Sequence, residues 1–182
     1  MITKEDLINY FQDGCKTKNN LRIGVEHEKF LFYSKSNKRI NFKTVKKVFN
    51  FLEQFNWKPT REKKNIIALH KKNKSITLEP GNQIELSGAT LKSIHQNCGE
   101  SYEFLDELKK ACKEFDLRMV ASSYDPFTRL QDVPKNPKQR YEIMAEEMPK
   151  NGKRSLEMMY QTSGTQINLD YTSEKDFIKK FK

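Results

Sequence analysis

The sequence predicts an α+β protein in which helices pack against an antiparallel sheet that has one polar face. In several segments apolar residues recur every three or four positions, as in amphipathic helices. In others polar and apolar residues alternate, as in strands with one solvated and one buried face. With 182 residues, of which 36% are hydrophobic and 11% aromatic, the chain is long and apolar enough to form one domain with its own core.

The first part of the chain is predicted to form a helix, a strand and a second helix. Thr3, with Asp6 three residues later, is typical of a capping box, and Gly14 marks the end of the first helix. Arg22–Tyr33 follows as a strand. From Thr44 onward apolar residues recur at helical spacing, which predicts an amphipathic helix. These residues are Val45, Val48, Phe49, Leu52 and Phe55.

The middle of the chain is predicted to form a meander. Ile66–Leu69 and Ser75–Glu79 have strand-like patterns, and the polar turn His70–Lys74 joins them. Gln83–Leu86 is expected to continue the second strand after a Pro-Gly interruption.

A long helix and another strand follow. Apolar residues spaced by three and four positions predict the helix and place Cys98 and Cys112 on its core-facing stripe. The stripe consists of Leu91, Ile94, Cys98, Tyr102, Leu105, Leu108, Cys112 and Phe115. Leu117–Ser123 is predicted as a strand.

The last part of the chain is predicted to contain a loop, two helices and a strand. Asp125–Lys138, with three prolines, is the loop, and Arg140–Met148 is a short helix. Met158–Tyr171 is predicted as a strand, and a second capping box at Ser173 and Asp176 begins the final helix. Because the sequence stops about two turns into this helix, we expect the chain to be truncated relative to its functional unit. The alternative is a short C-terminal helix that packs on its own domain.

The composition excludes several classes of protein. The formal net charge is +10, but the basic residues are dispersed and lack interleaved aromatic residues that could stack bases, so we expect no nucleic-acid partner. No apolar run is long enough for a signal peptide or a membrane span. Three irregularly spaced cysteines do not form a disulfide scaffold or a zinc site. We therefore expect a cytoplasmic protein with free thiols and no membrane partner.

Acidic and amide side chains share one face of the predicted strands. Residues two apart in a strand point the same way, so Glu26 and Glu28 lie together and oppose His27. Two carboxylates on one face repel each other unless a cation lies between them. The same parity recurs in the later strands. It groups Thr77, Glu79, Gln83 and Glu85, and then Thr162, Gly164, Gln166, Asn168 and Asp170.

These polar faces have two interpretations. One is an antiparallel sheet with a solvated side, but a solvated face in so lysine-rich a chain should carry lysines. The other is a magnesium site, because Mg²⁺ prefers carboxylate, carbonyl and water ligands. The zinc-protease motif is excluded because its second His would fall on Leu31. There is no P-loop, so metals and basic side chains would have to hold any ATP phosphates.

Six short sequence segments, distributed over most of the chain, together resemble a known family. They are Ile23–Phe30 (IGVEHEKF), Leu78–Gly88 (LEPGNQIELSG), His95–Cys98 (HQNC), Arg140–Met144 (RYEIM), Met148–Lys150 (MPK) and Gln166–Asp170 (QINLD). In order and spacing they resemble the plant and proteobacterial glutamate–cysteine ligases, from about residue 20 to the last residue. The resemblance implies that residues 1–182 are the N-terminal part of a single ligase domain.

The resemblance also implies a fold and a reaction. The fold would be that of the glutamine-synthetase-like carboxylate-amine ligases, incomplete here, with a concave polar sheet face that binds metals, ATP and glutamate. The γ-carboxylate of L-glutamate would take the γ-phosphate of ATP to form γ-glutamyl phosphate, and the amine of L-cysteine would then displace phosphate. This is the first step of glutathione biosynthesis, with Mg²⁺ neutralising the phosphoryl oxygens.

Several residues match the family's binding positions, and none is assigned a catalytic role. The resemblance implies that carboxylates and one amide hold magnesium: Glu26, Glu28, Glu79, Glu85 and Gln166. Asn168 falls near the amino-acid pocket. Arg140 could hold a substrate α-carboxylate with its guanidinium group, or it could be purely structural.

Two alternatives remain open at this point. A related ligase could join glutamate to an amine other than cysteine. A non-catalytic basic binding module could retain the ligase scaffold. In either case the small-molecule and C-terminal partners of the ligase are expectations that follow from the resemblance.

Overall fold

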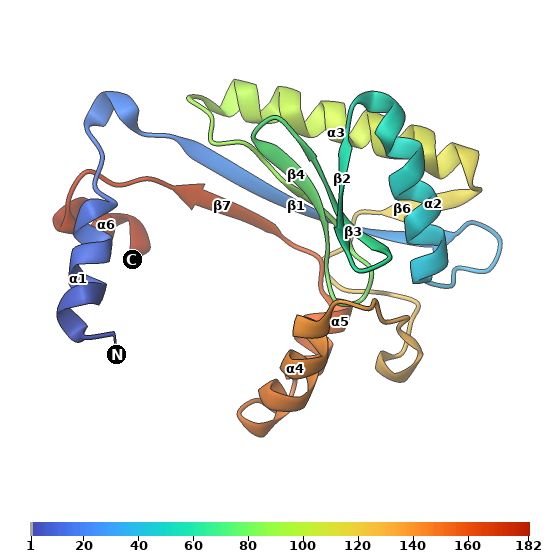
Figure 1. Ribbon diagram of the computed structural model, residues 1–182. Helices are drawn as coiled ribbons and strands as arrows, with labels where there is room; N and C mark the ends of the chain where they lie inside the picture. Colours follow the sequence, from blue (N-terminus) through green and yellow to red (C-terminus); the bar gives the residue numbers. More distant parts are fainter. Residues whose placement is uncertain (1) are drawn as a thin grey trace.

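The computed structural model describes residues 2–182 and confirms the α+β class (Figure 1). Seven strands form one antiparallel sheet in the order β2-β3-β4-β5-β1-β6, and β7 also pairs with β1. The strands are β1 (Ile23–Tyr33), β2 (Lys58–Glu62), β3 (Asn65–Lys71), β4 (Lys74–Leu78), β5 (Ile84–Ser87), β6 (Leu117–Val120) and β7 (Thr165–Leu169). The α-helices are α1 (Lys4–Asp13), α2 (Phe42–Leu52), α3 (Ile94–Glu114), α4 (Gln139–Glu147), α5 (Ser155–Gln161) and α6 (Glu174–Phe181). Single 3₁₀ turns lie at Lys18–Asn20, Glu53–Phe55, Leu130–Asp132 and Met148–Lys150.

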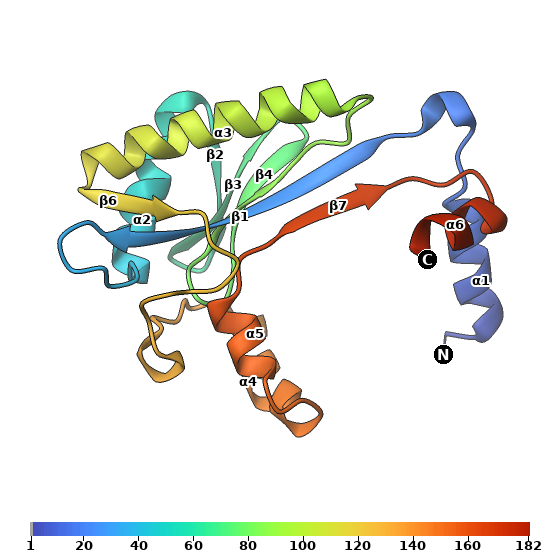
Figure 2. The ribbon, with the colours of Figure 1, turned by 180° about the vertical axis from the view of Figure 1, so that it is seen from behind.

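Helices α2 and α3 cover one face of the sheet, and the main core lies between these layers (Figure 2). The apolar stripe predicted for α2 is confirmed, since Val45, Val48, Phe49 and Leu52 are all fully buried. From the sheet, β4 and β5 contribute a row of side chains that are at most 1% exposed. These are Ile76, Leu78, Ile84 and Leu86. Helices α4 and α5 project on the other side of the sheet.

Strand β1 is the centre of the sheet because three strands pair with it. Its first half pairs with β7, its middle with β5 and its last four residues with β6. His27 contacts α3, with 3.0 Å between its Nε2 atom and Ser101 Oγ. Since alternate residues of a strand point to opposite faces, Glu26 and Glu28 lie on the face away from α3.

The predicted continuation of β4 through Gln83–Leu86 is wrong. The chain reverses after Leu78, and Ile84–Ser87 returns antiparallel to β4 as a separate strand. A left-handed residue, Asn82 at φ 62°, closes the turn and donates its N–H to the Glu79 carbonyl over 2.9 Å. The predicted grouping by face survives, because Thr77 pairs with Glu85 and directly opposed residues share a face. Strand β2, which pairs with β3, was not predicted.

The strand predicted over Met158–Tyr171 is only partly present. Its first part is helix α5, and strand structure is confined to Thr165–Leu169. Ile167 and Leu169 lie on the face opposite the polar side chains, and they are 59% and 54% exposed. The alternation therefore predicted a strand here, and only the structure shows that this strand pairs with β1 and leaves its apolar side chains exposed.

The apolar stripe of α3 is shifted from the predicted one. Cys98 is exposed, contrary to the prediction that it lies in the core, whereas Cys112 is buried as predicted. Tyr102 of the predicted stripe is 73% exposed. The buried positions are Asn97, Phe104, Glu107, Leu108, Ala111 and Cys112, so five of the six lie from Phe104 onward.

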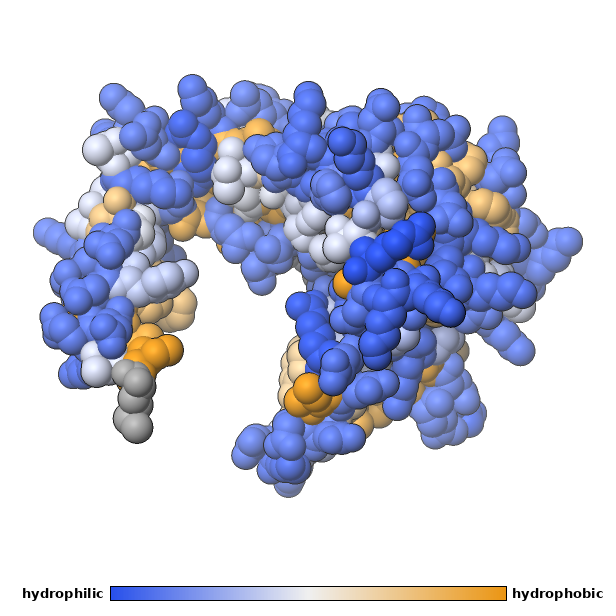
Figure 3. All heavy atoms as spheres, viewed as in Figure 1, coloured by the Kyte–Doolittle hydropathy of each residue, from blue (hydrophilic) through white to orange (hydrophobic). Residues whose placement is uncertain are grey.

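The two terminal helices lie side by side, away from the main core (Figure 1). The capping box of Thr3 and Asp6 is confirmed in α1. In α6 the side chain of Ser173 caps the helix as predicted. The Asp176 carboxylate, however, accepts a hydrogen bond from the backbone N–H of Thr172 and not from that of the cap residue Ser173. Figure 3 shows a wide hollow between this helix pair and α4–α5.

None of the helices within residues 2–182 has the length and apolar character needed to cross a membrane.

Candidate functional site

Three carboxylates meet on the face of the sheet opposite α2 and α3. Each of Glu28, Glu79 and Glu85 has a carboxylate oxygen within 4.8 Å of the others, and all three side chains are partly buried. Glu28 comes from β1, and Glu85 lies directly opposite it on β5. Glu79 comes from the turn that follows β4. We name these residues the carboxylate cluster.

The chain holds each member of the cluster by hydrogen bonds. The hydroxyls of Thr77 and Ser87 donate to Glu85 Oε1 over 2.9 and 2.6 Å. The backbone N–H of Gly164 donates to Glu28 Oε2 over 2.9 Å. Each of these contacts leaves at least one carboxylate oxygen of the acceptor free to bind another ligand.

Glu79 contacts the first turn of α4. The Tyr141 hydroxyl donates to Glu79 Oε1 over 3.2 Å, and the Arg140 guanidinium lies 3.7 Å from the same oxygen. Arg140 also donates to the Tyr141 hydroxyl over 2.6 Å. Arg140 is therefore beside the cluster, as a substrate-binding role requires, but its side chain is 63% exposed.

The cluster concentrates negative charge, which Lys138 and Arg140 compensate only in part. Burial raises the pKa of the Glu28 carboxyl, and the nearby Glu79 and Glu85 carboxylates raise it further. Burial and Glu85 also raise the pKa of Glu79. In the part of the chain that the structure describes, Arg140 makes the only ion pair with the cluster, at 3.7 Å. The nearest buried cation, Lys138, gives its ammonium hydrogen bond to the Leu78 carbonyl instead, and burial lowers its pKa to about 8.

A second polar group adjoins the cluster along β1 and β7. Glu26 is paired with Gln166 across the two strands, and Asn168 Nδ2 donates to Glu26 Oε1 over 3.2 Å. Gln166 Nε2 in turn donates to Asn168 Oδ1 over 3.1 Å. These three side chains lie on the same face as Glu28, but they form their own hydrogen-bonded group rather than part of the cluster.

The sequence did not predict the roles of three residues near the cluster. Asn136, Lys138 and Tyr141 are buried and donate hydrogen bonds to the turn that carries Glu79. Tyr141 stood within a quoted segment, whereas the other two lie in a predicted loop. A buried lysine in a Pro-rich loop has no local pattern that could identify it.

The cluster fits a divalent cation. Partly buried carboxylates of like charge destabilise one another unless a cation compensates them, and Mg²⁺ is bound through one or two carboxylates plus waters and phosphate oxygens. Histidine and cysteine, which soft metals prefer, are absent from the cluster. The donor set therefore matches a hard cation such as Mg²⁺.

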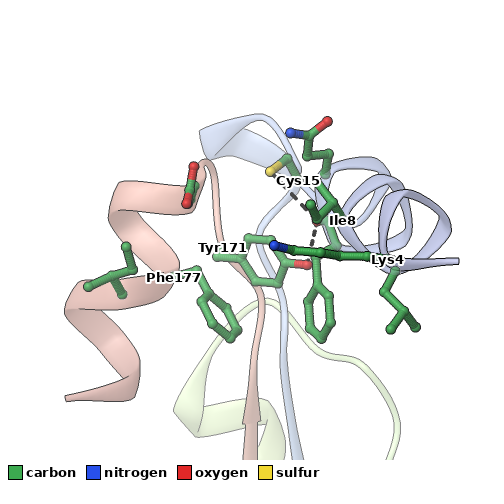
Figure 4. Close-up of a pocket in the computed structure, with 10 residues that line it drawn as sticks. Lys4, Ile8, Cys15, Tyr171 and Phe177 are labelled. Atoms are coloured by element: carbon green, nitrogen blue, oxygen red, sulfur yellow. Dashed lines mark hydrogen bonds between the residues drawn. The ribbon is translucent and has the colours of Figure 1, made fainter.

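A cavity of about 640 Å³ lies elsewhere, between α1 and α6 (Figure 4). Its lining is mainly apolar and includes Ile8, Cys15 and Phe177. Tyr171 at its wall donates to the Phe11 carbonyl over 2.7 Å. It contains no member of the carboxylate cluster, so it is separate from the candidate site.

The fold and the site together define an α+β protein with an antiparallel sheet that presents clustered carboxylates on one face. The family profile of glutamate-cysteine ligase family 2 (GCS2) matches residues 22–182. The chain belongs to this family.

Named relatives agree with this membership. The chain is 43% identical over its full length to glutamate–cysteine ligase A, chloroplastic, of Oryza sativa subsp. japonica, and covers 37% of that protein. It is 43% identical over its full length to the chloroplastic glutamate–cysteine ligase of Medicago truncatula, covering 36%. It is 42% identical over its full length to the chloroplastic glutamate–cysteine ligase of Arabidopsis thaliana and covers 35% of that protein. The chain thus spans about a third of the length of the curated relatives it matches.

Proposed function

We propose that this chain contributes a magnesium site to an ATP-dependent ligase that joins the γ-carboxylate of L-glutamate to the amine of L-cysteine. The carboxylate cluster is the observation that carries the proposal, and membership of the glutamate–cysteine ligase family supports it. The fold would be of the glutamine-synthetase-like carboxylate-amine ligase type. The remainder of the ligase, about two thirds of the relatives' length, would be its partner.

In this proposal Glu28, Glu79 and Glu85 hold the metal through their clustered oxygens. Glu26 and Gln166 extend the ligand set along β1 and β7, and their direct pairing supports this. Bound Mg²⁺ would neutralise charge on the ATP phosphates during phosphoryl transfer.

Two residues would bind the amino-acid substrate. Asn168 lies next to Glu26, and Arg140 lies next to Glu79, so the two mark opposite sides of the carboxylate face. The exposed guanidinium of Arg140 is free to donate two parallel hydrogen bonds to an α-carboxylate. The Asn168 amide can donate to or accept from the same substrate.

The reaction is tested on the longest polypeptide that the reading frame encodes. Phosphate release is measured with ATP, Mg²⁺ and L-glutamate, with and without L-cysteine. We expect release that depends on all four components. No release above the cysteine-free control would contradict the proposal, and a panel of other amines distinguishes a ligase with a different acceptor. EDTA should abolish release, and excess Mg²⁺ should restore it.

We also propose a cytoplasmic location. All three cysteines are free thiols, which suits a reducing compartment. The names of the relatives above place those proteins in chloroplasts. Fractionation of cells that express a tagged chain tests the location, and recovery in an organelle fraction would contradict it.

A further inference from the structure

The turn between β4 and β5 carries one member of the carboxylate cluster outside any strand. Glu28 and Glu85 are fixed by strand pairing with each other, whereas β4 ends at Leu78, one residue before Glu79. Two backbone hydrogen bonds close the turn, from Glu79 N to Gln83 O and from Asn82 N to Glu79 O, both 2.9 Å. The position of the Glu79 carboxylate therefore depends on what holds this turn.

Side chains from the segment before and within α4 hold the turn through its carbonyl groups. Lys138 Nζ donates to the Leu78 carbonyl over 2.7 Å, and the Tyr141 hydroxyl donates to the same oxygen over 2.8 Å. Asn136 Nδ2 donates to the Glu79 carbonyl over 2.8 Å and to the Pro80 carbonyl over 3.1 Å. We name Asn136, Lys138 and Tyr141 the turn clamp.

The turn clamp is buried, so its polar groups need the hydrogen bonds that they make to the turn. Asn136, Lys138 and Tyr141 are 7%, 6% and 4% exposed. A buried ammonium group is costly unless it is paired, and its natural partner here would be a carboxylate of the cluster. Lys138 instead bonds to a backbone carbonyl, so its contact fixes the main chain next to Glu79.

We propose, on the basis of the proposed metal site, that Lys138 and Asn136 are positioning residues that hold the β4–β5 turn so that Glu79 lies beside Glu28 and Glu85. For a substitution that removes the Lys138 charge, this role and simple electrostatics predict opposite changes in cation affinity. Loss of the Lys138 charge next to an anionic cluster would by itself strengthen cation binding. If the positioning role dominates, the same substitution weakens cation binding.

The test measures Mn²⁺ binding to the 182-residue chain by electron paramagnetic resonance of free Mn²⁺. Lys138→Met and Asn136→Ala are compared with the wild-type chain and with Lys150→Met, which removes an exposed lysine paired to Glu147. We expect a loss of affinity on the order of tenfold or more for both clamp variants, the range seen for residues that orient metal ligands. Lys150→Met should bind as the wild type does.

A second measurement follows the turn without any metal. Hydrogen exchange of the Glu79 and Asn82 amides should accelerate in both clamp variants, while the Ile76 amide in β4 stays protected. Far-UV circular dichroism checks that each variant is folded. If Lys138→Met does not fold, Asn136→Ala, which keeps every charge, still tests the proposal.

The outcomes separate the clamp from the metal site. Equal or tighter Mn²⁺ binding by the clamp variants, with unchanged exchange, would overturn the clamp. If Glu85→Gln leaves Mn²⁺ binding unchanged, the metal site fails instead, and the exchange rates still decide whether the clamp holds the turn.

Discussion

Glu28 and Glu85 lie directly opposite each other on the neighbouring antiparallel strands β1 and β5, with their side chains on the same face of the sheet. Like charges in this position destabilise a strand pair. The arrangement thus lowers the stability of the chain unless a cation lies between the two carboxylates. This relationship leads to the first prediction.

Replacement of one cluster carboxylate should stabilise the metal-free chain and remove its response to Mg²⁺. In Glu28→Gln or Glu85→Gln the repulsion is lost, so the melting temperature in EDTA should rise. Saturating Mg²⁺ at about 100 times its Kd should stabilise the wild-type chain by about 2.7 kcal/mol. The variants should lose most of this gain. Differential scanning calorimetry measures both effects.

Glu114→Gln provides the matched control, because it removes an exposed carboxylate at the end of α3. Its melting temperature should respond to Mg²⁺ as the wild type does. A full Mg²⁺ response in Glu28→Gln would count against a metal role for that residue.

Removal of one partner of a buried ion pair should destabilise the chain strongly. Arg39 and Asp125 are fully buried, and Arg39 Nε donates to Asp125 Oδ2 over 3.1 Å and Arg39 Nη1 to the Gly81 carbonyl over 2.8 Å. Because Asp125→Asn leaves an uncompensated buried guanidinium, it should cost about 3–5 kcal/mol in the free energy of unfolding. Urea titration measures this loss.

The surface pair of Lys180 and Asp176, at 2.9 Å on α6, is the comparison. Lys180→Met should cost far less than Asp125→Asn, because an exposed pair is screened by solvent. If Asp125→Asn and Lys180→Met lower the free energy of unfolding by similar amounts, burial does not determine the cost of breaking the Arg39 pair.

An exposed network should make stability depend on acidic pH. Lys71 and Lys74 lie 2.7 and 2.6 Å from Glu103 and lower its pKa to about 2 from the model-peptide value of 4.5. A carboxyl whose pKa is lower in the folded state stabilises the protein above its unfolded pKa. This contribution is lost as the pH falls from about 4.5 towards 2.

Glu103→Gln measures this contribution. At pH 7 the variant should be less stable than the wild type by up to about 1 kcal/mol, a modest value because Glu103 is 44% exposed. The difference should shrink between pH 4.5 and pH 2 in urea titrations. A difference that stays constant over this range would contradict the prediction.

Two glycines should respond in opposite ways to alanine. A Cβ atom on Gly99, within α3, meets nothing within 4 Å, so Gly99→Ala should stabilise the helix by about 0.5–1 kcal/mol. A Cβ on Gly81 would lie 2.5 Å from the Tyr160 carbonyl oxygen. Gly81→Ala should therefore destabilise the chain by roughly 1–3 kcal/mol. Thermal unfolding of the two variants gives the signs, and a neutral Gly81→Ala would mean that the turn has room to shift.

Local sequence patterns correctly predicted which residues share one face of a helix or strand wherever the residue spacing alone determines that face. The helical spacing in α2 correctly predicted its four buried residues. Strand parity correctly placed Glu26 and Glu28 on the face that also carries Glu85 and Gln166. Parity succeeded even across the unpredicted β4–β5 reversal, because an odd number of residues, the five from Glu79 to Gln83, separates the strands and so pairs odd-numbered residues with odd-numbered residues.

Patterns failed where distant contacts decide the outcome. Cys98 and Cys112 share the predicted stripe of α3, but most of the buried positions of that helix lie from Phe104 onward, so Cys112 is buried and Cys98 is exposed. Met158–Gln161 lies within the segment predicted as a strand, yet it is helical, and Met159 and Tyr160 form a small core with Val133 and Tyr141.

The sequence by itself determined the α+β class, the antiparallel sheet and the face on which the acidic residues lie, because each depends on the periodicity of one short segment. Only the tertiary structure decided that Glu79 joins Glu28 and Glu85 while Glu26 pairs with Gln166. Only the tertiary structure revealed that Lys138 donates to the carbonyl of Leu78, which precedes Glu79 and lies 60 residues before Lys138 in the sequence. Contacts between segments so far apart arise from the packing of the β4–β5 turn against α4, and no local spacing encodes that packing.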